Sequence, residues 1–375
     1  MSANDANELN AKGNTLFGSG EYQEAIKCYD EAIDKDPNHV WALRNKGVAL
    51  SRLGRLDKAI EHYEKAIAID QSYVDPWYDK GNALLDLGKF PEAISCFDRV
   101  LELDPTKAIA WDGRGVAFRN LGRYDDAIVC FEKALEIDPS DAGAWYSKAS
   151  VLDRLEKRDV AVKHYDKAIE FSTRAIELDQ NPLYNWTIKG DSLSALEKYS
   201  EAADCFNQAL KLEPNNPYAR SRLFFIYGEY LLQYDEALRI ARKDLEVRPD
   251  DISLKANLAE LLVKLGSYEE GRKYALQVLA ETQETKFQCV MRFLAISSYL
   301  LEENPSKANE EFEKFLKYYK NLDEDFRIES WSFRGLISAI SKSNANLQTK
   351  FLILALIDLL QSKIDRNNLS FFRAV

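Results

Sequence analysis

Residues 77–105 read WYDKGNALLDLGKFPEAISCFDRVLELDP, and this stretch decides the fold. Its apolar residues recur at spacings of three and four, which is the period of an amphipathic helix and not of a strand. Gly88-Lys89 divides the stretch into two such segments. Asp104-Pro105 ends the second segment, because proline cannot continue a helix. The stretch therefore predicts two helices joined by a tight turn.

The same pattern recurs with a period of 34 residues, which is typical of a repeat protein and outweighs an estimate of domain number from chain length. Each repeat has a glycine in its first helix, an alanine in its second, and an aromatic residue one turn after the alanine. We expect the glycine to let the second helix approach and place its alanine there, and the aromatic ring to fill the gap toward the next repeat. The positions are Gly13, Gly47, Gly81 and Gly115, then Ala25, Ala59, Ala93, Ala127 and Ala161, then Tyr29, Tyr63, Phe97, Phe131 and Tyr165.

This pattern resembles the tetratricopeptide repeat (TPR) family. The resemblance implies an all-α fold, a right-handed superhelical solenoid of about 9–10 TPR-like helix pairs, whose first helices line a concave groove. Six near-consensus units cover residues 6–216, after an N-terminal tail at residues 1–5. Degenerate units with an apolar final helix cover residues 217–363, and residues 364–375 form a C-terminal tail.

The fifth unit, residues 142–182, is seven residues longer than the others. Ala168-Ile169-Glu170 recurs as Ala175-Ile176-Glu177, which is the pattern of a duplicated heptad. Seven residues are almost two helical turns, so we expect a second helix longer by about 10 Å. The insertion is either a tolerated duplication or a functional ridge or change of superhelical pitch.

The apolar stretch from Phe351 to Ile357 has no polar face. A solenoid end needs a polar outer surface, so this helix must be covered. Burial against the preceding unit or the C-terminal tail is the first interpretation, and a homodimer interface is the second.

Composition excludes several classes of function. Lys and Arg number 50 and Asp and Glu 61, so the net charge of −11 opposes binding to nucleic acid. No run of 18 apolar residues is present, so we expect no membrane span. The first seven residues lack the basic and apolar regions of a secretory signal, which makes a cytoplasmic location the default expectation.

Candidate catalytic and metal-binding residues have structural explanations. Cys28, Cys96, Cys130 and Cys205 occupy one repeat position, and equivalent positions on packed helices lie too far apart for one metal ion. Gly190-Asp191-Ser192-Leu193 resembles an esterase motif, but its register places it inside a helix. We therefore predict no catalytic residue, no metal site and no cofactor.

The remaining candidate function is recognition in the groove. Asparagine both donates and accepts hydrogen bonds, and tyrosine, tryptophan and arginine are frequent at binding hot spots. The residues expected to line the groove are Asn10, Asn14, Trp41, Arg44, Asn45, Tyr78, Asp79, Asn82, Asp112, Arg119, Tyr146, Arg154, Tyr184 and Asp191.

The first repeat is similar to those of TPR domains that bind chaperones through a two-carboxylate clamp. Asn14 and Asn45 match the two clamp asparagines, but Asn10 replaces one clamp lysine. Asp75 and Asp79 replace the basic residues of the third unit. We therefore predict that this groove rejects the acidic tails of heat-shock chaperones and prefers a basic or amide-rich segment.

These observations predict a non-enzymatic adaptor that binds a protein or peptide partner. The alternative is a regulatory subunit that docks permanently on a catalytic partner through its C-terminal units.

Overall fold

The computed structural model describes residues 3–319, 349–350, 353 and 357. This part of the chain is helical with no strand, which confirms the predicted all-α class. Its elements are α1 (Ala3–Gly18), α2 (Tyr22–Lys35), α3 (Val40–Arg52), α4 (Leu56–Ile69), α5 (Val74–Asp86), α6 (Phe90–Leu103), α7 (Ala108–Asn120), α8 (Tyr124–Ile137), α9 (Ala142–Arg154), α10 (Arg158–Glu177), α11 (Pro182–Ala195), α12 (Tyr199–Leu212), α13 (Pro217–Phe225), η1 (Ile226–Tyr230), α14 (Tyr234–Val247), α15 (Ile252–Lys264), α16 (Tyr268–Glu281), α17 (Thr285–Leu301) and α18 (Pro305–Tyr319).

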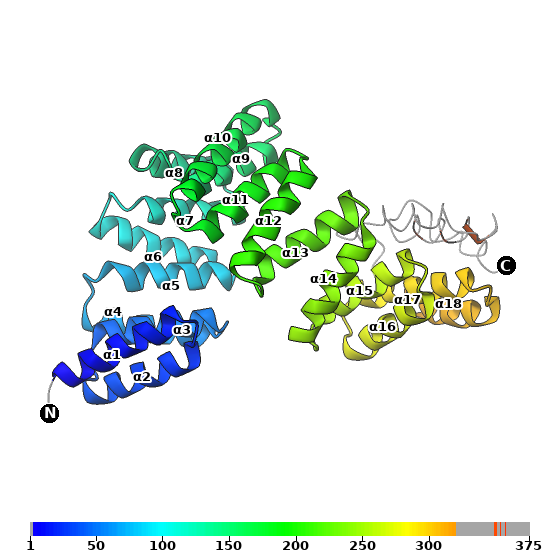
Figure 1. Ribbon diagram of the computed structural model, residues 1–375, viewed down its shortest axis with the longest axis horizontal. Coiled ribbons are helices and arrows are strands. Elements are labelled where there is room, and N and C mark those ends of the chain that lie inside the picture. Colours follow the sequence, from blue (N-terminus) through cyan, green and yellow to red (C-terminus); the bar gives the residue numbers. More distant parts are fainter. Residues whose placement is uncertain (1–2, 320–348, 351–352, 354–356, 358–375) are drawn as a thin grey trace. The chain divides into compact units, whose positions relative to one another are not determined.

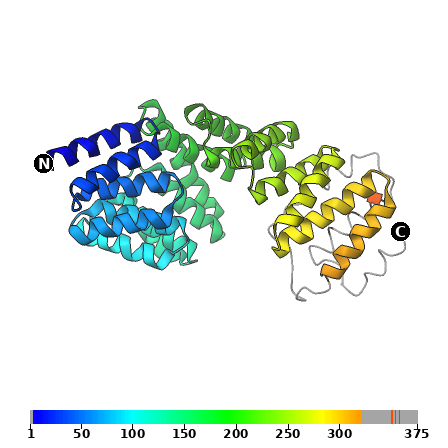
Figure 2. The same cartoon turned by 90° about the horizontal axis from the view of Figure 1, so that it is seen from below.

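The helices form successive pairs, in which an odd-numbered first helix packs against the even-numbered second helix that follows it, from α1–α2 to α9–α10 and again from α13–α14 to α17–α18 (Figure 1). The chain divides into two compact units, Met1–Leu196 and Glu197–Val375, which we call the N-terminal and C-terminal units. Helices α1 to α11 belong to the former and α12 to α18 to the latter, and the stacking of pairs within each is visible in Figure 2. The division falls in the turn between the two helices of the sixth repeat.

The first-helix glycines Gly13, Gly47, Gly81 and Gly115 each lie against an aromatic ring of the second helix. A Cβ added to Gly81 would lie 2.8 Å from Cε1 of Phe97, and one added to Gly113 in the next repeat would lie 2.6 Å from Cζ of the same ring. The ring of Phe97 therefore fills the space between two repeats. The three atoms nearest to a Cβ at the Gly81 position all belong to Phe97, so this ring, and not the alanine of the second helix, is the closest neighbour of the glycine.

One residue in each turn between paired helices adopts a left-handed conformation, with φ between 53° and 82°. Glycine adopts this conformation without steric cost, whereas residues with a Cβ pay a penalty. Four of the last five turns nevertheless have a larger residue at this position. The residues are Gly20, Gly54, Gly88, Gly122, Glu156, Glu197, Leu232, Gly266 and Glu303.

A short π-helix explains a change of register in the seventh repeat. Glu197 and Leu232 occupy equivalent turns but are 35 residues apart, one more than the usual period. The π-helix η1, Ile226–Tyr230, lies between them and follows α13 directly. A π-helical turn takes up one extra residue inside a helix, so the second helix of this repeat can still pack on the first.

The insertion in the fifth repeat lengthens α10. This helix has 20 residues, whereas α8 and α12 have 14 each. Six additional residues correspond to about 9 Å of helix, in agreement with the length expected from the duplicated heptad.

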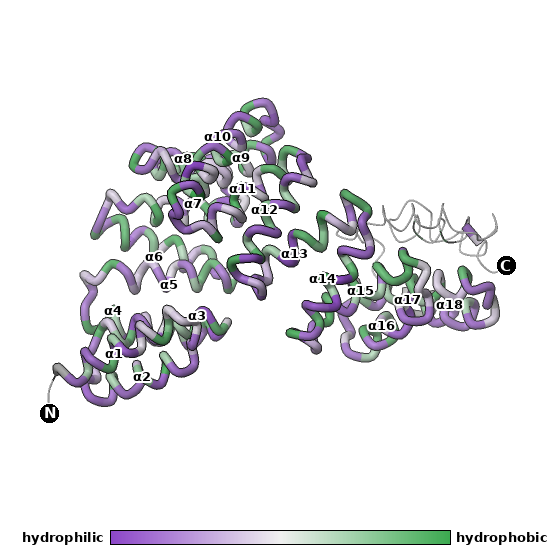
Figure 3. The backbone as a smooth tube through the Cα atoms, in the orientation of Figure 1, coloured by the Kyte–Doolittle hydropathy of each residue, from purple (hydrophilic) through white to green (hydrophobic). Residues whose placement is uncertain are grey.

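Each helix carries both apolar and polar residues, which appear in Figure 3 as successive green and purple segments of the tube. In the C-terminal unit a large apolar cluster includes Phe293, Phe312, Ile353 and Ile357. Ile353 and Ile357 are almost fully buried, which agrees with internal burial of the apolar stretch. The rest of residues 351–363 and the tail at 364–375 lie outside the described residues.

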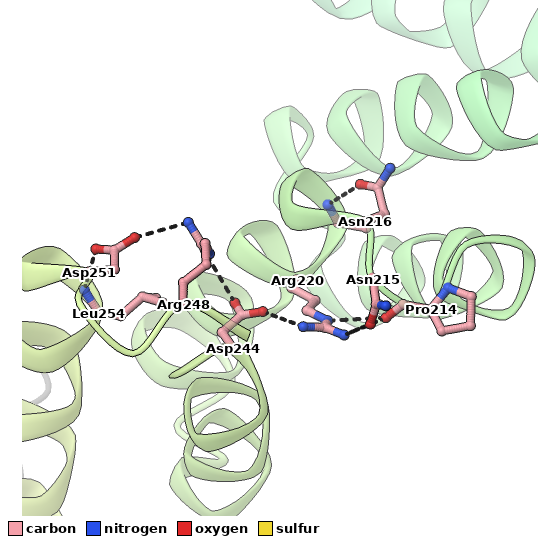
Figure 4. A network of polar contacts seen from close by, with 9 residues as sticks. Pro214, Asn215, Asn216, Arg220, Asp244, Arg248, Asp251 and Leu254 are labelled. Carbon is pink, nitrogen blue, oxygen red and sulfur yellow. Dashed lines mark hydrogen bonds and ion pairs between the residues drawn. The ribbon is translucent and has the colours of Figure 1, made fainter. Parts of the chain in front are cut away.

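A buried ion pair joins α13 to α14 in the C-terminal unit (Figure 4). Nη1 of Arg220 donates to Oδ1 of Asp244 at 2.7 Å, and both side chains are about 5% exposed or less. The other guanidinium nitrogens donate to the carbonyl oxygen of Pro214 and to the side chain of Asn215. Arg220 is thus fully engaged in holding the turn before α13 against α14.

Candidate binding face

The side chains predicted to meet a partner lie on the odd-numbered helices of the N-terminal unit, and we call this set the first-helix face. At its beginning three asparagines bind one another. Nδ2 of Asn45 on α3 donates to Oδ1 of Asn10 at 3.1 Å and to Oδ1 of Asn14 at 3.0 Å, both on α1. The hydroxyl of Tyr29 also donates to Oδ1 of Asn14, at 2.9 Å. The amide groups are therefore preorganised by the adjacent repeats.

Arg44 on α3 and Asp79 on α5 form an ion pair across adjacent repeats. Nε of Arg44 donates to Oδ2 of Asp79 at 2.6 Å. Burial raises the pKa of Asp79, and the hydrogen bond from Arg44 opposes this effect. The charge of Asp79 is thus largely neutralised by its partner, so other carboxylates must supply any negative potential of this face.

Four successive first helices bring two tyrosines and two aspartates together. Tyr78 comes from α5, Asp112 from α7, Asp141 from the N-cap of α9 and Tyr184 from α11. Burial raises the pKa of Tyr184, and the negative charges of Asp112 and Asp141 raise it further. The hydroxyl of Tyr184 lies against the backbone of Gly143, where any Cβ would overlap it. We call Tyr78, Asp112, Asp141 and Tyr184 the acidic-aromatic cluster.

Asp112 is the electrostatically exceptional member of this cluster. The residue is half-buried, but its Oδ1 is buried and has no hydrogen-bond partner in the part of the chain that the structure describes. Arg119 on the same helix donates instead to Oγ of Ser150, at 3.4 Å. Burial, together with the charge of Asp141, raises the pKa of Asp112 to about 7. This carboxyl group therefore carries a variable charge near neutral pH.

Asp141 is the member that the sequence interpretation missed. Its Oδ1 accepts hydrogen bonds from the backbone N–H groups of Gly143 and Ala144 at 2.9 and 3.2 Å, as expected of a helix N-cap. Burial raises its pKa, and these two hydrogen bonds oppose the increase. The 34-residue register could have identified this residue, because the N-caps of the first helices lie 34 residues apart. For α3, α5, α7 and α9 they are His39, Tyr73, Lys107 and Asp141.

The other predicted residues have varied surroundings. Trp41 is 55% exposed, and Arg154 is also exposed. Asn82 hydrogen-bonds to the hydroxyl of Tyr78 one turn before it on α5. Tyr146 packs near Tyr165, with ring centroids 5.9 Å apart. Asp191 is only 3% exposed, so its buried position is not that of a residue open to a partner.

The cysteines and the esterase-like string, which were not expected to be functional, are buried within helices. Cys28, Cys96, Cys130 and Cys205 are all buried. The esterase-like string lies within α11, as expected from its register, and the hydroxyl of Ser192 donates to the carbonyl oxygen of Ile188 at 2.8 Å. Among the described residues, no helix has the length and apolar composition needed to cross a membrane.

Comparison with known proteins identifies repeats in the N-terminal half of the chain. A family model described as "Tetratricopeptide repeat" matches residues 10–74 and 78–142, and one described as "Anaphase-promoting complex, cyclosome, subunit 3" matches residues 120–209. The TPR repeat-containing protein MJ1428 of Methanocaldococcus jannaschii is 28% identical over 147 residues. These residues are 38% of this chain and 25% of that protein, so the chain spans about a quarter of the length of this relative.

Solved structures of repeat proteins are similar to part of the chain. The crystal structure of MamA is 27% identical with a TM-score of 0.41, and the match covers 44% of this chain and 96% of that chain. MamA from Desulfovibrio magneticus RS-1 is 21% identical with a TM-score of 0.43, covering 45% and 96%. The structure of YrrB, described as a TPR protein with an unusual peptide-binding site, is 27% identical with a TM-score of 0.39, covering 44% and 86%.

Proposed function

The chain belongs to the tetratricopeptide repeat family, and we propose that it is a non-enzymatic adaptor that binds an extended segment of a partner protein along its first-helix face. The observation that carries this proposal is the convergence of Tyr78, Asp112, Asp141 and Tyr184 from four consecutive first helices. Repeat solenoids use such extended surfaces for recognition, because each repeat contributes side chains to a continuous face. A cytoplasmic location remains a prediction from the sequence.

The chemistry of this face supports a partner with basic or amide-rich character. The asparagines of α1 and α3 offer amide groups, and the acidic-aromatic cluster adds two carboxylates. Tyr184 is 42% exposed and Trp41 is 55% exposed, so aromatic rings are available for contact. An acidic peptide terminus would meet Asp112 and Asp141 instead of the lysines of a carboxylate clamp.

An alternative is a regulatory subunit whose residues 217–363 dock permanently on a catalytic partner, and the apolar stretch at 351–357 could instead join two copies of the chain. The burial of Ile353 and Ile357 within their own unit favours the adaptor over the homodimer. Mass measurement of the purified full chain in solution distinguishes a monomer from a dimer, and a catalytic subunit that co-purifies at fixed stoichiometry would favour the alternative.

The proposal is tested by selecting peptides from a random 12-residue display library on the immobilised full chain. The selected peptides are then titrated against the double variant Trp41→Ala/Tyr184→Ala, which removes two exposed aromatic residues of the first helices. The matched control is Val129→Ala/Val160→Ala, which removes two residues that are 54% and 44% exposed on the second helices α8 and α10.

We expect the first double variant to weaken peptide binding by about tenfold or more, since exposed aromatic anchors dominate such interfaces. The control should retain the affinity of the unmodified chain. Peptides that bind all three proteins equally would show that the first-helix face is not the binding surface.

A further inference from the structure

The acidic-aromatic cluster contains a carboxyl group, that of Asp112, whose buried oxygen receives no hydrogen bond from the described part of the chain. Oδ1 of Asp112 is buried without a hydrogen-bond partner among the described residues, and the carboxylate of Asp141 increases the negative potential around it. Arg119, the cation on the same helix whose charge acts on Asp112, donates its hydrogen bond to Ser150. A buried carboxylate without a partner is costly, so its presence calls for a group that supplies both positive charge and hydrogen-bond donors.

The surroundings of Asp112 match one kind of ligand. Besides burial, the negative charge of Asp112 contributes to the raised pKa of both Tyr78 on α5 and Tyr184 on α11, so the two tyrosine hydroxyls lie within reach of its charge. A cation is attracted to the face of a tyrosine ring. Asp141 already uses Oδ1 for the N-terminus of α9, which fixes its carboxylate in place. A planar guanidinium group offers several donors to carboxylates and stacks on aromatic rings, properties that a compact ammonium group combines less well.

We propose that the acidic-aromatic cluster is a subsite for one arginine side chain of the bound segment, with Asp112 as its ion-pair partner and Asp141, Tyr78 and Tyr184 around it. This inference rests on the proposed function, because it assigns a specific position on the first-helix face to one residue type of the partner. Asp112 is thereby a residue that destabilises the free protein and becomes stabilised on binding.

Occupation of the subsite is coupled to the ionisation of Asp112. The guanidinium group stays charged at any pH at which the protein is folded, whereas Asp112 must lose its proton to pair with it. The groups that face Asp112 are Asp141 from the start of α9, Arg119 from α7 and the two tyrosine hydroxyls, which remain protonated up to high pH. Binding of arginine should therefore release a proton near neutral pH.

The test titrates the full chain with N-acetyl-L-arginine methylamide and follows the backbone amide resonances of Gly113 and Gly143 by NMR, which are present in every variant. In the chains that retain Asp112, its side-chain carboxyl ¹³C resonance is followed as well. The neutral isostere N-acetyl-L-citrulline methylamide serves as the matched probe, and N-acetyl-L-lysine methylamide distinguishes a guanidinium site from a general cation site. Asp112→Asn is compared with Asp166→Asn, a substitution of an exposed aspartate on α10 that removes the same charge.

The arginine probe should cause a saturable shift, with about tenfold weaker binding for the citrulline and lysine probes and for Asp112→Asn. Asp166→Asn should bind like the unmodified chain. Binding by the unmodified chain should also strengthen between pH 5.5 and 8, a measurement that does not depend on any variant. Equal binding of arginine and citrulline, an unchanged affinity in Asp112→Asn, or an affinity independent of pH would each overturn the subsite, and equal binding of lysine would overturn its selectivity for arginine.

These results can be separated from those of the peptide selection. Selected peptides that need Trp41 and Tyr184 but bind Asp112→Asn as tightly as the unmodified chain would support the adaptor function and overturn the arginine subsite. Conversely, a saturable and Asp112-dependent arginine signal in a chain that selects no peptides would support the subsite and contradict the proposed function.

Discussion

Nε of Arg44 lies 2.6 Å from Oδ2 of Asp79, and this ion pair connects the first helices of the second and third repeats. The side chains are 29% and 15% exposed, so solvent screens the pair only in part. Asp79 was predicted to present a free negative charge to a partner. In the structure an arginine from the preceding repeat pairs with Asp79 instead. The carboxyl oxygen that lacks a partner among the described residues of this face belongs to Asp112.

The Arg44–Asp79 pair should couple adjacent repeats. Arg44→Ala leaves the carboxyl group of Asp79 without its donor, and we expect a loss of about 1–2 kcal/mol in the free energy of unfolding. The double variant Arg44→Ala/Asp79→Ala should recover part of this loss, because no unpaired carboxylate remains. A double-mutant cycle measured by urea denaturation gives the coupling energy directly. Strictly additive effects of the two substitutions would show that the pair does not link the repeats.

Asp112→Asn should stabilise the free protein in a pH-dependent manner. The pKa of Asp112 is about 7 in the folded protein, while an aspartate in the unfolded chain titrates near pH 4. The folded state thus holds a proton that the unfolded state releases, so the contribution of Asp112 to stability falls as the pH rises from about 4 to about 7. The asparagine variant lacks this loss and should gain about 1–3 kcal/mol relative to the unmodified chain above pH 7.

Urea denaturation at several pH values between 4 and 8 measures this difference. Asp166→Asn is the control, and its difference from the unmodified chain should stay nearly constant over the same range. A decrease in stability of Asp112→Asn at pH 8 would mean that the carboxylate makes favourable interactions in the free protein.

Leu232→Gly should stabilise the seventh repeat. Leu232 has a φ of 53°, a conformation that the equivalent turns at Gly54, Gly88 and Gly122 reach without steric cost. Its side chain is 38% exposed, so its removal costs less packing than the removal of a buried leucine. We expect a net gain of about 0.5–1 kcal/mol, the relief of strain minus the greater chain entropy of glycine.

The control for this prediction is Leu178→Gly, at an exposed residue with a φ of −91°. No strain is relieved there, so this variant should lose stability in the same thermal or urea measurement. If both leucine variants lose stability equally, the left-handed conformation at position 232 carries no cost.

Asp244→Ala should strongly destabilise the C-terminal unit. The substitution leaves the guanidinium group of Arg220 buried without its carboxylate, which typically costs about 3–5 kcal/mol. Arg239→Ala on the same helix removes an exposed pair with Glu236 and should change stability by less than about 0.5 kcal/mol. Urea denaturation followed by circular dichroism compares the two, and similar effects of both variants would argue against the importance of the buried pair.

The sequence by itself determined the helices, their pairing and their order along the chain. These features depend on interactions within about one repeat, such as the three-and-four spacing of apolar residues in 77–105 and the glycine and proline positions that end each helix. The longer α10 was predictable for the same reason, since a duplicated heptad adds turns without changing which face is apolar. The ring of Phe97 fills the gap toward the next repeat as expected, but its close approach to Gly81 was not predicted, because spacing alone does not reveal which of two neighbouring side chains lies nearest to the glycine.

The tertiary structure alone decided which polar groups meet and which remain unpaired. Tyr78 and Tyr184 are separated by three repeats in the sequence. They nevertheless lie near the same aspartates, because successive first helices contact one another side by side. Likewise, Asp79 and Asp112 are equivalent candidates in the sequence. Only the packing of α3 against α5 pairs Asp79 with Arg44, whereas Oδ1 of Asp112 has no hydrogen-bond partner among the described residues. Charge and burial depend on distances in space, and a repeat pattern specifies residue types at each position without specifying those distances.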